Sequence, residues 1–209
     1  SKDRGWFYPK AGTASPPSSV SGLLLEASAI SFSYDINLGK STVIRTPVCD
    51  IFGIDHPIFL GGMGSIYSPA LVAAVSEAGG LGAMGCHRLS PQQIKEAAAD
   101  IRGRTNRSFA LNFLIFHAEE ESFAAALAER PPAMAFAWPR PDQDIKSYVG
   151  RAKDAGCKVT YMAGGVPEAL IGVEAGADVI VAQGTEGGGH VSWNATMAPC
   201  CCAPARMRG

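Results

Sequence analysis

The chain has 209 residues, of which 47% are hydrophobic and 18% charged, and its formal net charge is −1. This near-neutral charge removes any general electrostatic case for binding nucleic acid or acidic membranes. No stretch approaches the roughly 18 uninterrupted apolar residues of a membrane span. We therefore expect a soluble globular protein whose partners include neither nucleic acid nor a membrane.

The six cysteines include the adjacent trio Cys200, Cys201 and Cys202, and none of them forms a CxxC pair. Three neighbouring cysteines cannot close an ordinary zinc site by themselves, so we expect no metal. Scattered buried thiols in a reducing compartment are the simpler interpretation.

Residues 1–45 are rich in Ser, Gly and Pro, as in the stretch TASPPSSVSG. Their one apolar patch, LLLEASAISF, is interrupted by Glu26 and lacks a basic lead followed by a clear cleavage site, so a secretory signal is not expected. The pattern predicts a loosely ordered N-terminal extension. We expect a cytoplasmic protein, with organellar targeting by this extension left open.

From Thr46 onward, short apolar runs alternate with amphipathic segments. The runs predict strands at 56–63, 81–86, 109–116, 133–138, 157–163 and 178–184. The segments between them predict helices at 68–80, 90–103, 119–130, 142–156 and 166–176. Ser68-Pro69 and Ser90-Pro91 each combine a capping serine with a proline at the first helical position, which is a helix-start signal.

Strict alternation of apolar strands with helices indicates an α/β fold with a parallel sheet. An open doubly wound sheet and a closed (β/α)8 barrel of the TIM type both fit, and a spacing of roughly 20–25 residues per unit is typical of the barrel. Only about six βα units are visible. We therefore predict an incomplete barrel over residues 46–197 and a divergent Cys-rich tail, without helix or buried strand, over 198–209.

The segment Gly80–Gly85, GLGAMG, matches the GxGxxG dinucleotide fingerprint, and Asp100 follows about 20 residues later. That fingerprint requires a strand before the glycines and a helix directly after them. Here a predicted helix precedes the glycines, and the glycines overlap the next strand. The pattern therefore favours a helix end followed by a tightly packed strand.

The four histidines differ in their predicted places. His56 lies at the mouth of the first strand, opposite the expected active face, and is interpreted as structural. His87 and His117 each follow a strand, on the face where barrels carry catalysis. His190 follows a strand and three glycines and is the best candidate for an acid or base. A loop histidine held by a backbone carbonyl is the alternative for His190.

Two amides occur where apolar residues are expected. Asn112 lies inside the strand FALNFLIF, and Gln183 lies at the end of DVIVAQG. A buried amide must find hydrogen-bond partners, from neighbouring backbone or from a ligand. Two amides at the carboxyl ends of parallel strands suggest a shared planar ligand rich in heteroatoms, and a flavin ring is one such ligand.

Three blocks together carry a family resemblance: HPIFLGGMGSIYSPALVAAVSEAGGLGAMG, the Asn112 strand, and GVEAGADVIVAQGTEGGGHVSW. They resemble the nitronate monooxygenases, formerly called 2-nitropropane dioxygenases, over roughly Thr46 to Met197. The resemblance implies a (β/α)8 barrel that binds FMN non-covalently at the carboxyl ends of its strands. It also implies oxidation of alkyl nitronates by molecular oxygen to a carbonyl compound and nitrite. The flavin-dependent enoyl-ACP reductases share much of the pattern and remain the alternative enzyme.

Matched residue by residue, the resemblance assigns cofactor binding to Gly62, Met63, Asn112, Gln183 and Gly188. Gly62 and Met63 would lie along the flavin at the end of the first strand. Asn112 and Gln183 would hydrogen-bond the ring or the ribityl chain, and Gly188 would let the backbone approach the cofactor.

The same matching makes His190 the catalytic residue, which would deprotonate a neutral nitroalkane or orient the nitronate. Imidazole is suited to this task because its unperturbed pKa lies near neutrality. The expected partners are a small nitroalkane or nitronate and O2, with a homo-oligomer possible.

The resemblance stops before the loops after strands 7 and 8, which grip phosphate in barrels of this kind. The sequence instead ends VSWNATMAPCCCAPARMRG. Three explanations are open: a fragment or truncated gene model, a short paralogue that acts as a binding or interaction protein, or a barrel completed by another chain. We expect the 209-residue chain, purified with excess FMN, to carry little flavin absorbance.

Overall fold

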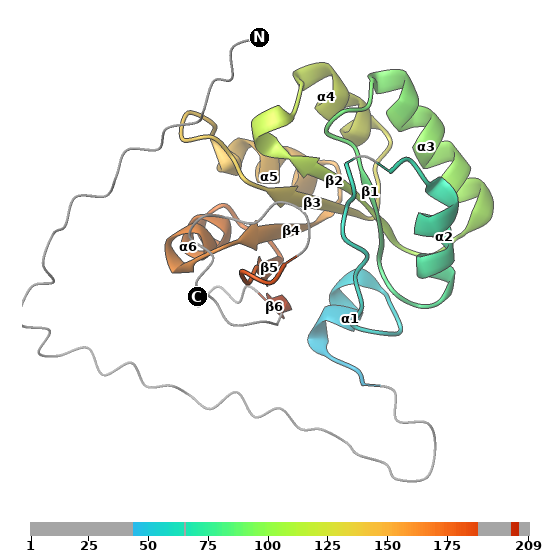
Figure 1. Ribbon diagram of the computed structural model, residues 1–209, viewed down its shortest axis with the longest axis horizontal. Helices are drawn as coiled ribbons and strands as arrows, with labels where there is room; N and C mark the ends of the chain where they lie inside the picture. Colours follow the sequence, from blue (N-terminus) through green and yellow to red (C-terminus); the bar gives the residue numbers. More distant parts are fainter. Residues whose placement is uncertain (1–43, 65, 188–201, 205–209) are drawn as a thin grey trace, which may run out of the picture. The chain divides into compact units, whose positions relative to one another are not determined.

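The computed structural model describes residues 44–64, 66–187 and 202–204 (Figure 1). All described residues belong to one unit, Val43–Gly209. The domain boundaries expected at residues 45 and 197 stay predictions. Across the described ranges, every helix is too short or too polar to cross a membrane.

Five parallel strands form the main sheet. They are β1 (Gly82–Gly85), β2 (Phe109–Leu114), β3 (Ala133–Ala137), β4 (Lys158–Ala163) and β5 (Val179–Ala182). Each strand pairs with the next one along the chain, in the order β1-β2-β3-β4-β5. A doubly wound sheet reverses its strand order at a switch point, whereas a barrel does not. The topology is therefore that of part of a barrel.

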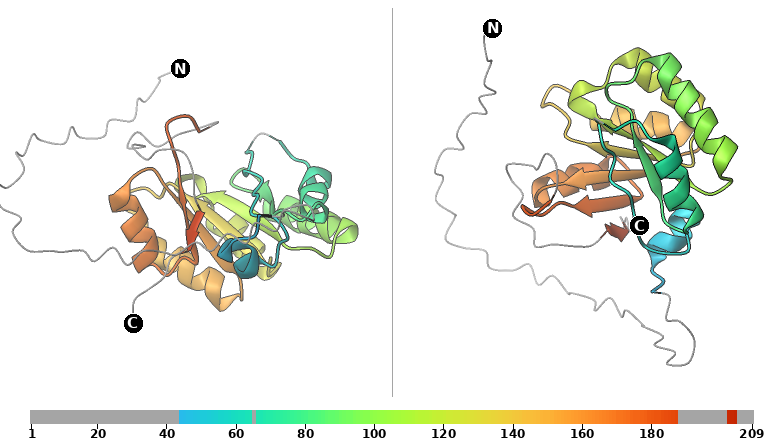
Figure 2. Two further views of the ribbon diagram at one scale, coloured as in Figure 1. Left: turned by 90° about the horizontal axis from the view of Figure 1, so that it is seen from below. Right: turned by 45° about the vertical axis from the view of Figure 1, so that its right-hand side comes forward.

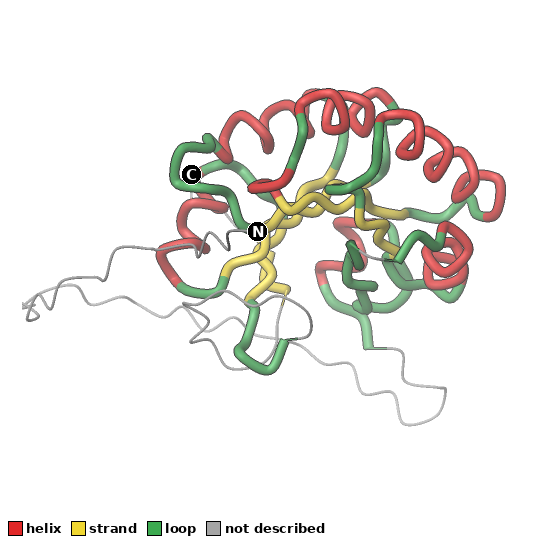
Figure 3. Tube along the Cα trace, turned by 45° about the horizontal axis from the view of Figure 1, so that its top comes forward, coloured by secondary structure: helices red, strands yellow, loops and turns green. Residues whose placement is uncertain are grey.

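Five helices cover one face of this sheet as an arc, seen in Figure 3. They are α2 (Pro69–Glu77), α3 (Pro91–Arg104), α4 (Glu120–Ala128), α5 (Ile145–Asp154) and α6 (Val166–Glu174). All five were predicted. The start signals act as expected, because the Ser68 side chain accepts a hydrogen bond from the Leu71 backbone and Ser90 forms a capping box with Gln93.

In β2 and β3 the largest residues lie on the helix side, and smaller ones such as Ala110 and Ala133 lie on the other side. In β2, Leu111 and Phe113 join the core beneath the helices, where Phe123 and Phe136 pack beside them. The opposite, concave face holds a smaller core that includes Ala110. This smaller core is closed by α1 (Pro47–Phe52), a helix that the sequence pattern missed.

The strand predicted at 56–63 is wrong over most of its length. The structure holds a single parallel bridge there, between Phe59 and Leu81. Pro57 has no backbone N–H to donate to a ladder, and glycines follow at 61 and 62, which weaken a strand. The predicted strand 109–116 also ends early, because its last residues enter a short 3-10 helix, η1 (Ile115–His117).

The tail contains one short strand that the sequence pattern did not predict, β6 (Cys202–Pro204). This segment pairs antiparallel with Val179–Val181 of β5 (Figure 2). A physical reason lies in β5, whose outer side would otherwise be a row of unpaired N–H and C=O groups open to any extended segment. Edge pairing of this kind needs no hydrophobic pattern, so no local sequence signal marks it.

Candidate active site

A glycine-rich segment, residues 60–64, crosses the carboxyl ends of β1 and β2. Leu60 donates its backbone N–H to the Leu81 carbonyl at 2.9 Å, which ties the segment to the start of β1. A Cβ added to Gly62 would lie only 2.5 Å from Cβ of Asn112, and one added to Gly85 would lie 2.7 Å from the Met63 carbonyl oxygen. Only glycine allows both approaches. The structure thus brings Gly62, Met63 and Asn112 together.

Asn112 is 9% exposed, and its side chain faces the concave side of the sheet. Its Nδ2 donates to the Ala135 carbonyl of β3 at 3.2 Å, and its own backbone carbonyl accepts from Cys86 at 2.8 Å. Within the described ranges this is the one hydrogen bond of the Asn112 side chain. The side-chain carbonyl Oδ1 can therefore accept a hydrogen bond from a ligand that lies against Gly62.

Gln183 follows β5 at the same carboxyl edge and is 8% exposed. Its backbone N–H donates to the Ala163 carbonyl at 2.8 Å, and a turn closes behind it where Gly187 donates to Gly184 at 3.1 Å. Asn112 and Gln183 lie three strands apart, which is about 14 Å across the sheet at ~4.8 Å per step, and Gln183 also lies four residues beyond Val179, the residue of β5 in register with Asn112. They do not touch, so a ligand that reaches both must span the concave face.

Residues of β3 and β4 lie on the concave face between the strands that carry the two amides. Ala135 pairs in register with Asn112 on one side and Thr160 on the other, and Ala135 and Met162 are partly exposed. A flat ligand could rest on this surface with Asn112 and Gln183 at its edges. The two remaining predicted site residues, Gly188 and His190, lie outside the described residues, directly beyond the turn at 184–187.

The loops after β1, β2 and β3 carry a row of rings that sequence reasoning did not assemble. His87 lies against Gly64, and its ring is stacked 6.2 Å from that of His117 at an interplanar angle of 18°. Phe116 lies 4.2 Å from His117 and 6.4 Å from Trp138 between ring centroids. His87 and His117 were predicted to face the active side one by one. The signal for their pairing was that both follow neighbouring parallel strands.

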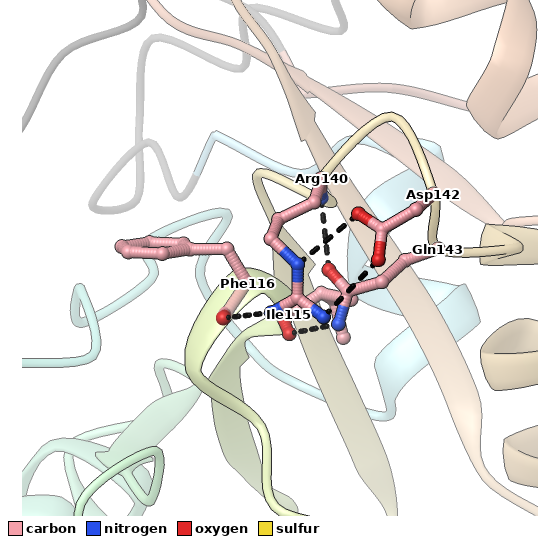
Figure 4. Close-up of polar contacts among 5 residues, drawn as sticks. All are labelled: Ile115, Phe116, Arg140, Asp142 and Gln143. Carbon is pink, nitrogen blue, oxygen red and sulfur yellow. Dashed lines mark hydrogen bonds and ion pairs between the residues drawn. The ribbon is translucent and has the colours of Figure 1, made fainter. Parts of the chain in front are cut away.

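A polar clamp fixes the backbone beneath this row, as Figure 4 shows. Arg140 Nη1 donates to the Phe116 carbonyl at 2.6 Å, and Gln143 Nε2 donates to the Ile115 carbonyl at 2.9 Å. Gln143 Oε1 also accepts from the Arg140 backbone at 2.8 Å, and Asp142 pairs with the guanidinium at 3.1 Å. The loop after β3 thereby holds η1 in one position.

Two buried groups near the strands are unsuited to acid–base chemistry. Burial raises the pKa of the Cys86 thiol to about 12, so it stays protonated at neutral pH. Burial, with a contribution from Glu168, raises the pKa of Tyr161 to about 12 as well. The described residues hold no cluster of His, Cys, Asp and Glu that could bind a metal ion.

The remaining sequence motifs have structural roles. His56 donates its backbone N–H to the Gly79 carbonyl at 2.9 Å, beyond the end of α2 and away from the strands' carboxyl ends. The GxGxxG segment forms β1, and α3 begins only at Pro91 after an intervening loop. This arrangement agrees with a packed strand and lacks the helix that a dinucleotide fingerprint requires.

Comparison with known proteins gives one family match, to residues 45–138, for the model described as nitronate monooxygenase. The chain is 29% identical over 153 residues to (3aS,4S,5R,7aS)-5-hydroxy-7a-methyl-1-oxo-octahydro-1H-indene-4-carboxyl-CoA dehydrogenase of Mycobacterium tuberculosis (73% of this chain, 42% of that protein). It is 29% identical over 182 residues to a probable nitronate monooxygenase of Staphylococcus aureus (70% and 50%). The chain spans about half the length of the curated relatives it matches.

Two solved structures resemble the fold. FabK from Thermotoga maritima superposes with a TM-score of 0.65 at 32% identity, covering 72% of this chain and 47% of that one. A nitroalkane oxidase from Streptomyces ansochromogenes superposes with a TM-score of 0.59 at 27% identity, covering 70% and 50%. These likenesses and the strand order confirm the predicted α/β fold of the (β/α)8 TIM-barrel type, present here in part.

Proposed function

We propose that this chain, which belongs to the nitronate monooxygenase family, forms the ring-binding part of an FMN site where an alkyl nitronate is oxidised by O2 to a carbonyl compound and nitrite. The observation that carries the proposal is the contact of Gly62 with Asn112 at the carboxyl ends of the first strands. Because the chain spans about half of its curated relatives, the activity of the whole protein is part of the proposal.

The residues present fit a flavin ring on three counts. The absence of a side chain at Gly62 makes room for the Asn112 side chain, and Asn112 keeps Oδ1 available to accept from the ring's N3–H or a ribityl hydroxyl. Gln183 brings a second amide to the opposite side of the concave face. Met63 would lie along the ring, and Gly188 would let the backbone come close to it.

The bound flavin would supply the electron acceptor and the place where O2 reacts. The chain's own residues need only position the nitronate against it and exclude water, which is how proteins contribute to cofactor chemistry. A nitronate is a carbanion equivalent, so no metal is required to activate it.

His190 is the proposed base. Its imidazole would remove the proton from the carbon next to the nitro group of a neutral nitroalkane, and it would then orient the nitronate formed. The variant His190→Asn keeps a hydrogen-bonding side chain but cannot accept this proton. It is expected to lose activity on neutral nitroalkanes and to retain much of its activity on pre-formed nitronates. Equal loss on both substrates would defeat the assignment of His190 as base.

A second candidate function is reduction of an unsaturated thioester. The likeness to FabK and to a dehydrogenase whose name specifies a carboxyl-CoA substrate favours it. This reaction needs a nicotinamide donor, which separates the two candidates. Rapid bleaching of the flavin by NADPH without substrate favours the reductase, and bleaching by a nitronate favours the oxygenase. A chain that acts only as a binding or interaction protein would give neither response.

The direct test of the proposed function is product formation. The purified chain, supplied with FMN, is given ethyl nitronate in air, and nitrite and oxygen uptake are measured together. The proposal predicts nitrite release that depends on FMN and is abolished in Asn112→Leu. Nitrite release that is the same with and without the protein would contradict it.

A further inference from the structure

The ring row defined by His87, His117, Phe116 and Trp138 begins where the proposed flavin site ends. His87 lies against Gly64, two residues after the glycine that contacts Asn112. From there the rings follow one another across the carboxyl ends of β1, β2 and β3. The row therefore borders the proposed site on its outer side, where the part of a substrate that does not react would lie.

The rings are not core residues. His117 is exposed, and Phe116 and Trp138 are half-buried, whereas the core rings Phe113, Phe123 and Phe136 are almost fully covered. In Figure 4 the Phe116 ring points away from the polar clamp formed by Arg140, Asp142 and Gln143. These three rings are thus at least partly open to solvent, where a ligand can contact them.

The row is held rigidly. Besides the contacts of Arg140 and Gln143, the Phe116 backbone N–H donates to the Trp138 carbonyl at 3.1 Å. Trp138 itself has a φ of 54°, one of two positive values among the described non-glycine residues. A left-handed conformation costs free energy in a bulky residue, and such strain gathers where a side chain must be aimed. The Trp138 ring lies 6.4 Å from that of Phe116 between centroids, at the end of the row.

We propose that the ring row binds the non-reacting part of the substrate, and that this part is an aromatic or otherwise planar conjugated group. The inference rests on the proposed function and names the substrate class of that site. Imidazole, phenyl and indole rings pack on planar π systems in offset or edge-to-face geometry. A saturated alkyl chain has no π system and cannot make this interaction. The preferred substrate is therefore an aryl-substituted nitronate.

The test compares two anions with the same reacting group. The nitronates of 2-phenylnitroethane and nitroethane are titrated by calorimetry into the full chain without flavin. Because no substrate is oxidised in the absence of flavin, the measurement reports binding alone. We expect the phenyl compound to bind about tenfold tighter, as one aromatic pair allows. Phe116→Leu keeps apolar volume but removes the ring, and His117→Ala removes its neighbour; each should reduce the preference to about twofold. Leu170→Ala, on the exposed side of α6, is the matched control and should keep the full preference.

Equal affinity for the two nitronates, or no binding of either, overturns the inference. So does a preference that survives Phe116→Leu intact, because the recognition would then be apolar rather than aromatic. The same variants are also tested for riboflavin binding. If they lose as much affinity for riboflavin as for the phenyl nitronate, the ring row stacks on the flavin and not on the substrate. A preference for the phenyl nitronate without nitrite release would support this inference and contradict the proposed oxygenase activity. Nitrite release without such a preference would support the oxygenase activity and contradict this inference.

Discussion

Substitution of Gly62 by alanine tests the contact on which the candidate site is built. The new methyl group would lie 2.5 Å from Cβ of Asn112, about 1 Å inside the ~3.5 Å separation that carbon atoms prefer. Overpacking of this kind costs about 1–3 kcal/mol. Displacement of Asn112 would also break its 3.2 Å hydrogen bond to Ala135, which adds about 1 kcal/mol.

The neighbouring residue provides a matched control. A Cβ on Gly61 meets no atom within 4 Å, so Gly61→Ala should cause no clash. It should be neutral, or it should stabilise the protein by about 0.5 kcal/mol because alanine lowers the conformational entropy of the unfolded chain. Urea denaturation followed by far-UV circular dichroism measures both variants. We expect Gly62→Ala to lower the free energy of unfolding by about 2–4 kcal/mol relative to Gly61→Ala.

A double variant tests whether Asn112 is the residue with which the new methyl group clashes. Asn112→Gly removes the three atoms that the new methyl group would meet, so Gly62→Ala should cost much less in that background. Equal stabilities for Gly61→Ala and Gly62→Ala would refute the reasoning. So would additive effects of Gly62→Ala and Asn112→Gly, because residues in contact must couple.

Two further predictions concern the stability of the fold. Arg130 follows α4 with a φ of 45°, in the position that glycine occupies after α2, α5 and α6 (Gly79, Gly156 and Gly176). Glycine adopts this left-handed conformation without strain, so Arg130→Gly should raise the free energy of unfolding by about 0.5–1 kcal/mol. A loss of stability in thermal denaturation would instead show that the arginine side chain makes a contact worth more than this strain. Burial raises the pKa of the Cys86 thiol from 9.0 to about 12. Between these two pH values the thiol loses its proton in the unfolded chain but keeps it in the folded chain. The Cys86 thiol therefore lowers the free energy of unfolding by about 1.4 kcal/mol for each pH unit in this range. Denaturation at pH 8, 9.5 and 11 should show a shallower alkaline loss in Cys86→Ala than in the unsubstituted chain, and identical slopes would contradict the buried thiol as its source.

The elements that could be predicted from the sequence are those whose signals are local. Ser68 and Ser90, each followed by proline, mark helix starts because the cap and the fixed φ act within one turn. The apolar runs mark β1 to β5 because a parallel strand covered on both faces needs apolar residues throughout. The helix α1 was missed because six residues are too few to display a period, and the run at 56–63 misled because Pro57 and two glycines leave only one bridge.

The candidate site divides in the same way. Asn112 and Gln183 could be singled out because a buried amide inside an apolar strand is a local anomaly, and the structure buries both, Asn112 beside the last residue of β1 and Gln183 directly after β5. The ring row could not be assembled, because stacking of His87 on His117 depends on the curvature of the sheet and on the clamp from Arg140, which no local pattern encodes. The roles of Gly188 and His190 stay predictions.

The most direct test of the central claim is a titration of the 209-residue chain with riboflavin and with FMN, followed by quenching of flavin fluorescence. Gly62, Asn112 and Gln183 are proposed to contact the flavin ring, and in barrels of this family the phosphate is expected to be bound by the loops after strands 7 and 8. We therefore predict saturable but weak binding of both flavins with similar affinity, reduced at least about tenfold for both by Asn112→Leu, as loss of one buried hydrogen bond to a ligand allows. No quenching by either flavin, or affinities unchanged in Asn112→Leu, would contradict the claim that these strand ends hold a flavin ring.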